Sequence, residues 1–341
     1  MGNAGSHTHR GLGGYGCLQE GRGPGEGRGR TDRRHHPYSS SPIGVGRGCR
    51  GALSEEDGKE SGAPLPLRHG ARGIVGSGNR ERLYRTEAII LRRRDFGEAD
   101  KLLTLYAPGL GKTRVLAKGV RKPKSRKSGH VELFTHSNLL IAKGRSLDIV
   151  TQAETIHSFL PIRSELLRIS YAYYAAELLD RFTEEGEENR PLFDLLLDTL
   201  FRLGDSEDPD LVLRYFELRL LGYVGYRPQL FQCVRCARAI EMATGFFSPK
   251  DGGLLCLGCG EGERGCQETS PRALATLRCV QVRDYAYCRR LKVDRPTHEE
   301  LENLMRRYIT YLLEGRLKSV GFIDALRRED GGVTTAVLTR R

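Results

Sequence analysis

The spacing of apolar positions changes along this chain and divides it into parts of different predicted structure. In residues 83–160, short apolar runs of strand length alternate with turn residues such as Gly and Pro. After Pro161 the apolar positions recur every three to four residues, as they do on the buried face of a helix. Residues 1–82 contain almost no apolar run. The pattern therefore predicts an N-terminal extension, a β domain and a helical domain.

Five strands account for the pattern between residues 83 and 160. Their expected ranges are 85–94, 101–106, 112–120, 132–142 and 146–156. The segment Pro108–Gly111, between the second and third of these, is a strong hairpin signal. Five short strands in so few residues predict a small closed β-barrel of the oligonucleotide-binding kind, the OB-fold.

A helical domain is predicted over residues 161–325, followed by a flexible C-terminal tail at residues 326–341. Helices are expected from Ser164 to about Gly186, from Pro191 to Gly204, from Asp208 onward, after Ser270, and from Thr297 to Gly315. In the last of these, Thr297 and Glu300 have the spacing of a capping box. The predicted fold class is α+β multidomain, with an N-terminal five-stranded OB-fold barrel followed by an all-α domain.

Residues 1–82 hold 21 of the 42 glycines, many of them in Gly-Arg repeats. Such a composition cannot bury enough apolar surface to offset chain entropy, so we expect disorder. A dispensable extension, arising from a start codon assigned too far upstream, is favoured over a segment that binds nucleic acid loosely. No stretch has the pattern of a signal peptide or a membrane span, so we expect a cytosolic protein.

Charge adds a second pattern. The formal net charge is +12, but residues 83–160 carry +8 and residues 161–341 carry −1. Nine Lys and Arg, and no Asp or Glu, occur between Lys101 and Val131. A charge run is usually a solvated surface. So many uncompensated cations nevertheless favour a polyanion partner, because phosphates relieve their mutual repulsion.

The third predicted strand divides these charges by face. Side chains alternate along a strand, so Lys112, Arg114 and Lys118 share one face, while Val115 and Ala117 face the barrel interior. The expected nucleic-acid contacts are Arg92, Arg94, Lys101, Lys112, Arg114, Lys118, Arg121, Lys122, Lys124, Arg126 and Lys127. Because aromatic residues are sparse here, binding should depend on phosphates and be nearly indifferent to base sequence.

Two pairs of cysteines predict a metal site. Cys233 and Cys236 are separated from Cys256 and Cys259 by nineteen residues, and paired cysteines at this spacing indicate one structural Zn²⁺ ion in a module at residues 231–262. Four thiolates leave no coordination position open for water, so no catalytic role is expected. Gly258 and Gly260 are expected to give the backbone freedom that the metal-binding turns need. Ordinary buried or disulfide-bonded cysteines are the alternative.

The order and spacing of several segments resemble the RecO family of bacterial recombination mediators, over about residues 83–325. The segments are Ala88–Arg94, Phe96–Leu105, Gly111–Lys112, Ala117–Lys122, Phe216–Tyr223, Pro228–Leu230, Phe247–Pro249 and Gly252–Cys256. Residues 1–82 have no counterpart in the family pattern.

The resemblance implies a DNA repair and homologous recombination factor that is not an enzyme. Such a protein binds single- and double-stranded DNA and anneals complementary strands. It also helps RecR load RecA onto DNA coated by single-strand-binding protein. The implied partners are thus DNA, RecR and single-strand-binding protein, with RecA indirectly and no membrane. The implied location is the cytoplasm, in association with the nucleoid.

Two other classes of protein share some of these features. An RNA- or ribosome-associated zinc-ribbon protein would have both the metal site and the basic barrel. A nucleotide hydrolase would use the Gly109–Thr113 turn, but its phosphate-binding loop requires a glycine where Tyr106 stands and a helix where a strand is predicted.

Overall fold

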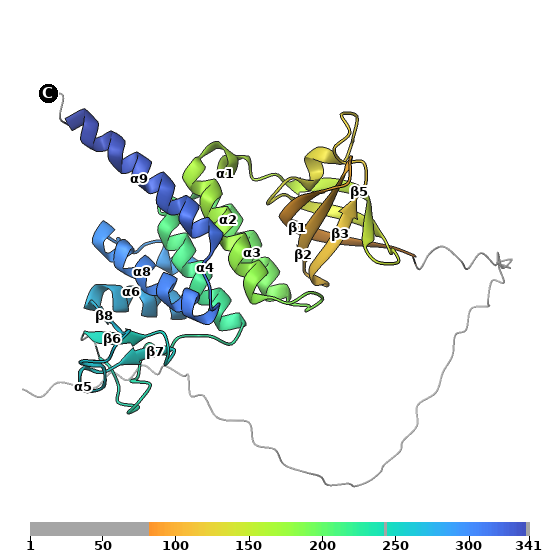
Figure 1. Ribbon diagram of the computed structural model, residues 1–341. Coiled ribbons are helices and arrows are strands. Elements are labelled where there is room, and N and C mark those ends of the chain that lie inside the picture. The colour runs from red at the N-terminus through yellow and green to blue at the C-terminus, as the bar shows by residue number, and fades with distance from the viewer. Residues whose placement is uncertain (1–81, 242–243, 339–341) are drawn as a thin grey trace, which may run out of the picture. The chain divides into compact units, whose positions relative to one another are not determined.

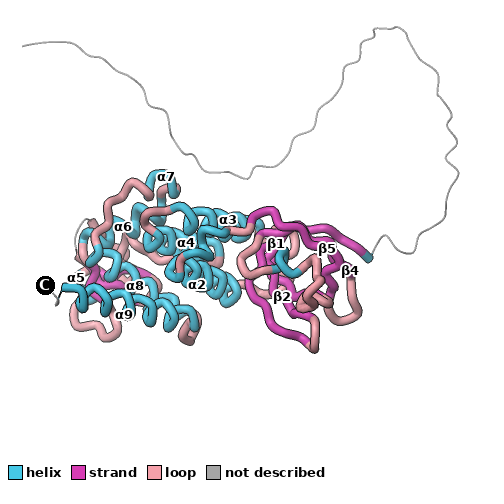
Figure 2. The backbone as a smooth tube through the Cα atoms, turned by 90° about the horizontal axis from the view of Figure 1, so that it is seen from above, coloured by secondary structure: helices cyan, strands magenta, loops and turns pink. Residues whose placement is uncertain are grey.

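The computed structural model describes residues 82–241 and 244–338, all of which belong to one compact unit. Strands form a small barrel, and helices form a larger lobe that follows it in the chain (Figures 1 and 2). The predicted disorder of residues 1–82 concerns residues that, apart from Arg82, lie outside the described ones. Among the described helices, none is both long and apolar enough to cross a membrane.

The barrel is built from five strands in the order β1-β2-β3-β5-β4. They are β1 (Leu83–Phe96), β2 (Asp100–Ala107), β3 (Gly111–Ala117), β4 (His136–Ala142) and β5 (Asp148–His157). Neighbouring strands are antiparallel except β3 and β5, whose short parallel pairing closes the barrel. This five-stranded barrel has the OB-fold that the sequence predicts.

Buried aliphatic side chains fill the barrel interior. They include Ala88, Ile90, Leu103, Leu105, Val115, Ala117, Leu139, Ile141 and Val150. The predicted alternation in β3 is confirmed, because Val115 and Ala117 are fully buried and Arg114 is exposed on the opposite face. The barrel therefore presents β3 cations outward.

The helical lobe begins with α1 (Leu160–Ser164), α2 (Leu166–Phe182), α3 (Arg190–Asp205) and α4 (Pro209–Tyr223). The side chains of Asn189 and Asp208 accept backbone hydrogen bonds and cap α3 and α4, each of which has a proline in its first turn. The first predicted helix corresponds to α2 but does not begin at Ser164, because Ser164 ends α1 and the extended Glu165 occupies the N-cap of α2. It also ends at Phe182, before Gly186.

A small sheet and further helices complete the lobe. The sheet consists of β6 (Gly245–Ser248), β7 (Gly253–Leu255) and β8 (Gln267–Thr269), and the helices are α5 (Leu257–Gly260), α6 (Pro271–Val282), α7 (Tyr285–Cys288), α8 (Arg295–Leu312) and α9 (Lys318–Leu338). Phe247 of β6 packs edge-on against Tyr308 of α8, with ring centroids 5.3 Å apart. The sheet is therefore part of the lobe's apolar core.

The predicted capping box at the start of α8 is wrong. Asp294 caps this helix, and its carboxylate accepts a hydrogen bond from the Thr297 backbone N–H at 3.1 Å. Glu300 points elsewhere and accepts from both the backbone N–H and the hydroxyl of Ser270, each at 2.6 Å. A long-range contact to the start of α6 thus replaces the local one.

α9 runs from Lys318 to Leu338, so most of the predicted tail at residues 326–341 has helical backbone, while its flexibility stays a prediction. Arg327, near the middle of α9, contacts two other helices. Its guanidinium donates to Asp210 at 2.6 Å and also pairs with Glu302, which ties α9 to α4 and α8.

Polar contacts at the end of α2 hold the barrel against the helical lobe, and we call this set the joint. The Lys112 Nζ of β3 donates to the backbone carbonyls of Asp180 and Thr183, at 2.6 and 2.5 Å, and lies 3.3 Å from the Asp180 carboxylate. Arg92 of β1 donates to the same carboxylate at 2.8 Å. Lys112 is only 11% exposed, so the contact replaces most of its hydration.

The backbone of the segment after α2 completes the joint. Gly186 donates its N–H to the Lys112 carbonyl at 2.9 Å. Gly111 has a φ of 60°, and a Cβ added there would lie 1.8 Å from the Glu187 carbonyl oxygen. Only glycine fits this close approach. The Gly111–Lys112 pair therefore serves the contact between barrel and lobe.

A buried ionic group lies inside the helical lobe. Glu217 of α4 is fully buried and accepts hydrogen bonds from Arg214 at 2.7 Å and from Tyr174 at 2.6 Å. Burial raises the pKa of Glu217 to about 7, against the opposing effects of the Arg214 charge and the Tyr174 hydroxyl.

Replacing the shared carboxylate should loosen the joint. Asp180→Ala leaves Lys112 poorly hydrated and without its carboxylate, so we expect the free energy of unfolding to fall by about 2 kcal/mol in urea titrations. Asp198→Ala is the matched control, because Asp198 forms an exposed pair with Arg202 one turn away on α3. Loss of the pair between Asp198 and Arg202 should lower the free energy of unfolding by less than about 0.5 kcal/mol. Equal stabilities of the two variants would contradict this role for Asp180.

Glu217 should make stability depend on pH. Its folded pKa of about 7 lies above the ordinary 4.5, so the folded state binds the extra proton between these values and stability is lost as pH rises through 7. Glu217→Gln should remove this loss while leaving stability near pH 5 almost unchanged. Thermal melting from pH 5 to 8 measures the difference, and a Gln variant that tracks the wild type at every pH would refute the assignment.

Candidate functional site

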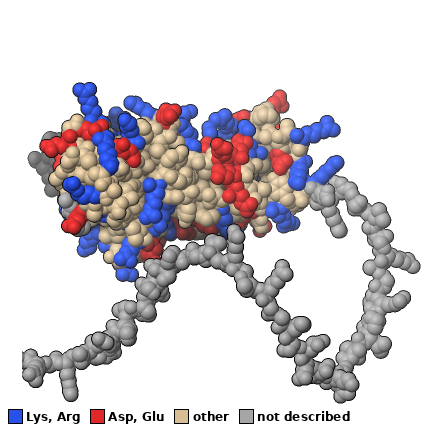
Figure 3. Space-filling model, turned by 90° about the horizontal axis from the view of Figure 1, so that it is seen from below, with Lys and Arg blue, Asp and Glu red and all other residues tan. Residues whose placement is uncertain are grey.

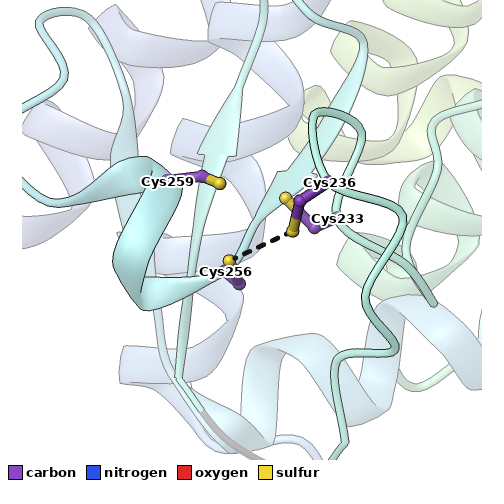
Figure 4. Close-up of side chains that lie close together, drawn as sticks. All are labelled: Cys233, Cys236, Cys256 and Cys259. Carbon is purple, nitrogen blue, oxygen red and sulfur yellow. Dashed lines mark hydrogen bonds between the residues drawn. The ribbon is translucent and has the colours of Figure 1, made fainter.

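Four cysteine sulfurs converge at the edge of the small sheet (Figure 4). The Sγ atoms of Cys233, Cys236, Cys256 and Cys259 all lie within 4.8 Å of one another, and those of Cys236 and Cys256 are 3.7 Å apart. All four thiols are free of disulfide bonds. A tetrahedral shell with metal–sulfur bonds of about 2.3 Å separates its sulfurs by about 3.8 Å. The arrangement therefore fits one metal ion.

Each cysteine pair lies on a tight turn. In the first, Ala237 donates its N–H to the Cys233 carbonyl at 2.9 Å and has a left-handed φ of 56°. In the second, Cys256 precedes α5, and its carbonyl accepts from Cys259 and Gly260 at 3.0 and 2.9 Å. Both turns leave the paired sulfurs on the same side, as chelation requires.

The thiol pKa values indicate why a cation is needed. Burial would raise the pKa of Cys233, but backbone N–H groups of Cys236, Cys256 and Arg235 lower it to about 6. Hydrogen bonds with the neighbouring thiols raise the pKa of Cys259 to about 12. Four adjacent sulfurs cannot all be thiolates without a positive charge between them. The donor set thus supports a bound divalent ion.

The expected role of the two glycines is corrected. Neither Gly258 nor Gly260 has a positive φ, so neither supplies unusual backbone freedom. A side chain at Gly258 would meet open space, whereas a Cβ at Gly260 would lie 2.6 Å from the Phe246 ring. Gly260 is therefore needed for close packing of α5 on β6.

Arg235 connects the two turns from outside the sulfur shell. Its guanidinium donates to Glu263 at 2.8 Å and to Asp251 at 3.3 Å, and it reaches the Cys259 carbonyl at 3.4 Å. The hydrogen bonds orient the turn that carries Cys259 relative to the one that carries Cys236.

The predicted nucleic-acid contacts fall into separate groups. Three of them are engaged by the helical lobe: Arg92 and Lys112 by Asp180, and Arg114 by Glu185 at 2.6 Å. Figure 3 shows acidic side chains gathered where the lobe meets the barrel. Asp180 and Glu185 already provide the anion that these three cations were expected to find in a phosphate.

A second group is held within the barrel. Asp95 accepts from Lys101 at 2.7 Å and lies 3.6 Å from Arg121, and these cations lower the pKa of its carboxyl group. Lys127 donates to the Val150 carbonyl at 2.8 Å, and burial lowers the pKa of its ammonium group. These contacts join residues within the barrel and are partly exposed, so they restrain the three side chains without removing their charge from the surface.

The remaining cations are exposed. They are Arg94 on β1 and Lys118, Lys122, Lys124 and Arg126 in the segment after β3, which we call the cationic loop (residues 118–127). Across residues 82–241 and 244–338, no carboxylate lies within ion-pair distance of these five. The backbone positions the loop, because Asp100 accepts from the Gly119 N–H at 2.7 Å.

Sequence reasoning missed the acidic partner of the barrel. Residues 184–188 have the sequence Glu-Glu-Gly-Glu-Glu, and the apolar pattern predicts only the end of a helix there. The negative charge of this run, opposite to that of β3, was the signal that could have indicated the contact. The contact was not predicted because Glu185 and Arg114 lie far apart along the chain.

Comparisons with known proteins identify relatives of most of the described region. Family models described as recombination protein O N terminal and recombination protein O C terminal match residues 82–159 and 163–320. The chain is 46% identical over 249 residues to the DNA repair protein RecO of Roseiflexus sp. strain RS-1, covering 73% of this chain and 88% of that protein.

Other relatives give the same result. The DNA repair protein RecO of Dehalococcoides mccartyi strain CBDB1 is 38% identical over 72% of this chain and 97% of its own length. That of Desulforamulus reducens is 38% identical over 75% of this chain and 100% of its own length.

The metal site can be tested by removing one ligand. We expect purified protein to contain one metal ion per chain and Cys236→Ser to contain much less, because three thiolates and a hydroxyl bind such ions weakly. Cys266→Ser is the control, since Cys266 lies outside the cluster. Elemental analysis measures the content. Equal metal in both variants would show that the cluster is not the site.

Proposed function

The chain belongs to the RecO family of DNA repair proteins, and we propose that it binds single- and double-stranded DNA through the cationic loop and anneals complementary strands. Its role lies in DNA repair and recombination. The observation that carries the DNA-binding proposal is the exposure of Lys118, Lys122, Lys124 and Arg126 on one loop of an OB-fold barrel.

The chemistry of the loop favours phosphate contacts. Lys118, Lys122, Lys124 and Arg126 have no carboxylate partner among the described side chains, so each is available to displace a counterion from DNA. Lysine and arginine bound to phosphates position a strand without reading its sequence. A protein that holds strands in this way reduces their mutual repulsion and leaves the bases free to pair, which is what annealing requires.

Association with other repair proteins follows from the family. We infer that the protein helps RecR load RecA onto DNA coated by single-strand-binding protein, and that it works in the cytoplasm at the nucleoid. It acts by binding and presenting DNA, without a covalent step of its own.

The metal is inferred to be Zn²⁺. Four sulfur ligands in a tetrahedral shell suit zinc, and a shell filled by protein leaves no position for substrate. Cys233, Cys236, Cys256 and Cys259 would hold it, and the ion would supply structural support to the sheet beside α8.

Removing the loop charges should abolish most DNA binding. The variant with Lys118, Lys122, Lys124 and Arg126 changed to Ala should bind every DNA sequence more weakly. The slope of log affinity against log salt should fall by about four, one for each lost phosphate contact. Fluorescence anisotropy at several salt concentrations measures both quantities.

A variant with the same charge change elsewhere is the control. A matched set of cations is exposed on the helical lobe and forms no ion pair with a described carboxylate, so its change to Ala should leave binding within about twofold: Arg227, Arg238, Arg264 and Lys292. Unchanged affinity in the loop variant would overturn the proposal. Preference for RNA over DNA of matched sequence would favour an RNA-binding role instead.

A further inference from the structure

A groove of about 740 Å³ lies between the barrel and the helical lobe, next to the joint residues Arg92 and Asp180. Its walls come from β1, from α2 and from the start of α9. Leu91, Leu133 and Ala176 form apolar parts of the surface, and Arg94, Arg181 and Lys318 supply positive charge. We call it the β1–α9 groove.

The acidic side chains of the groove are already engaged. Glu177 accepts from the backbone N–H groups of Lys318 and Ser319, at 2.9 and 2.8 Å, and from the Ser319 hydroxyl at 2.6 Å. Asp180 is occupied by Arg92 and Lys112 of the joint. The charge that the groove offers to a ligand is therefore positive.

The three cations of the groove are exposed, and Arg181 also donates to the Leu313 backbone carbonyl at 3.4 Å. In the described part of the chain, no carboxylate lies within ion-pair distance of Arg94, Arg181 or Lys318. They come from three different elements and line one hollow. Such convergence indicates an anionic ligand.

Exposed aromatic rings lie with these cations. Tyr173 of α2 is 39% exposed and Phe322 of α9 is 42% exposed, and both line the groove. Phe134 packs edge-on against Tyr173 with ring centroids 4.9 Å apart, which holds the tyrosine ring in place. Rings left open beside cations are the surface on which unpaired bases stack.

The cationic loop contacts the turn at the end of β1. Arg121 donates to the Gly97 carbonyl at 3.3 Å, which places the loop against that turn. Arg94, which lines the groove, lies three residues before Gly97, and Phe96 between them is 48% exposed. The loop and the groove therefore approach each other along the end of β1.

We propose that the β1–α9 groove binds single-stranded DNA, with bases stacked on Tyr173 and Phe322 and phosphates held by Arg94, Arg181 and Lys318. This inference rests on the proposed function and extends it to the helical lobe. Duplex DNA has no unpaired bases for the rings, so it binds through the loop alone. The groove thus separates the two kinds of DNA, and the contact of the cationic loop with the turn after β1, three residues from Arg94, favours DNA over an acidic peptide.

The test compares two double variants of the full chain. Tyr173→Ala with Phe322→Ala should weaken binding of a single-stranded oligonucleotide by about tenfold or more, while duplex binding changes less than about twofold. Tyr223→Ala with Tyr287→Ala is the control, because these rings are about equally exposed elsewhere on the helical lobe. Thermal melting checks that both variants are folded.

A second measurement reads the stacking directly. An oligonucleotide that contains 2-aminopurine should lose fluorescence when it binds the wild type or Tyr173→Phe, which keeps the ring, and should lose less with the groove variant. Equal single-strand affinity in the groove and control variants would overturn the inference. The inference would also be overturned if the groove variant lost binding to a labelled peptide of alternating Asp and Phe but still bound single-stranded DNA as tightly as the wild type.

The outcomes separate this inference from the proposed function. If the wild type binds DNA and the loop variant does not, the proposed function stands whatever the groove variant does. If the wild type binds neither form of DNA, the proposed function fails first.

Discussion

The contact between Lys112 and Asp180 determines how the rest of this protein is arranged. A lysine on the outer face of β3 is drawn against the end of α2, where a carboxylate and two backbone carbonyls replace its water. Gly111 permits the approach, because the backbone carbonyl of Glu187 leaves no room for a side chain at this position. Once the barrel is held in this position, Lys112 is largely covered, Arg114 is paired with Glu185, and β1 borders a hollow beside the same contact.

Basic side chains consequently have two roles in one small barrel. Arg114 and Lys112 contribute to holding the lobes together, whereas Lys118 and Lys122, a few residues later, remain in water. Net charge alone does not distinguish them. What distinguishes them is the acidic end of the α2 region, where Asp180 of α2 pairs with Lys112 and Glu185 after α2 pairs with Arg114, while no described carboxylate pairs with Lys118 or Lys122. The available charge of the barrel is thus smaller than its composition suggests, and it is confined to one edge.

Much of this architecture could be predicted from local sequence. Strand and helix ranges follow from apolar spacing, and the cluster of four cysteines follows from the spacing of Cys233 to Cys259, because both depend on neighbours along the chain. The cap of α8 and the partner of Lys112 could not be predicted. Glu300 has a suitable local position but makes a better contact with Ser270, and Asp180 lies 68 residues from Lys112. No local pattern specifies such pairings.

The order of the two partners in the chain has a consequence for biosynthesis. A ribosome completes the barrel before it makes α2, so Lys112 and Arg114 emerge with no internal carboxylate to cover them. The nascent barrel accordingly exposes a broader cationic face than the finished protein does. Completion of the helical lobe narrows that face, and maturation therefore lowers the tendency of the chain to hold polyanions indiscriminately.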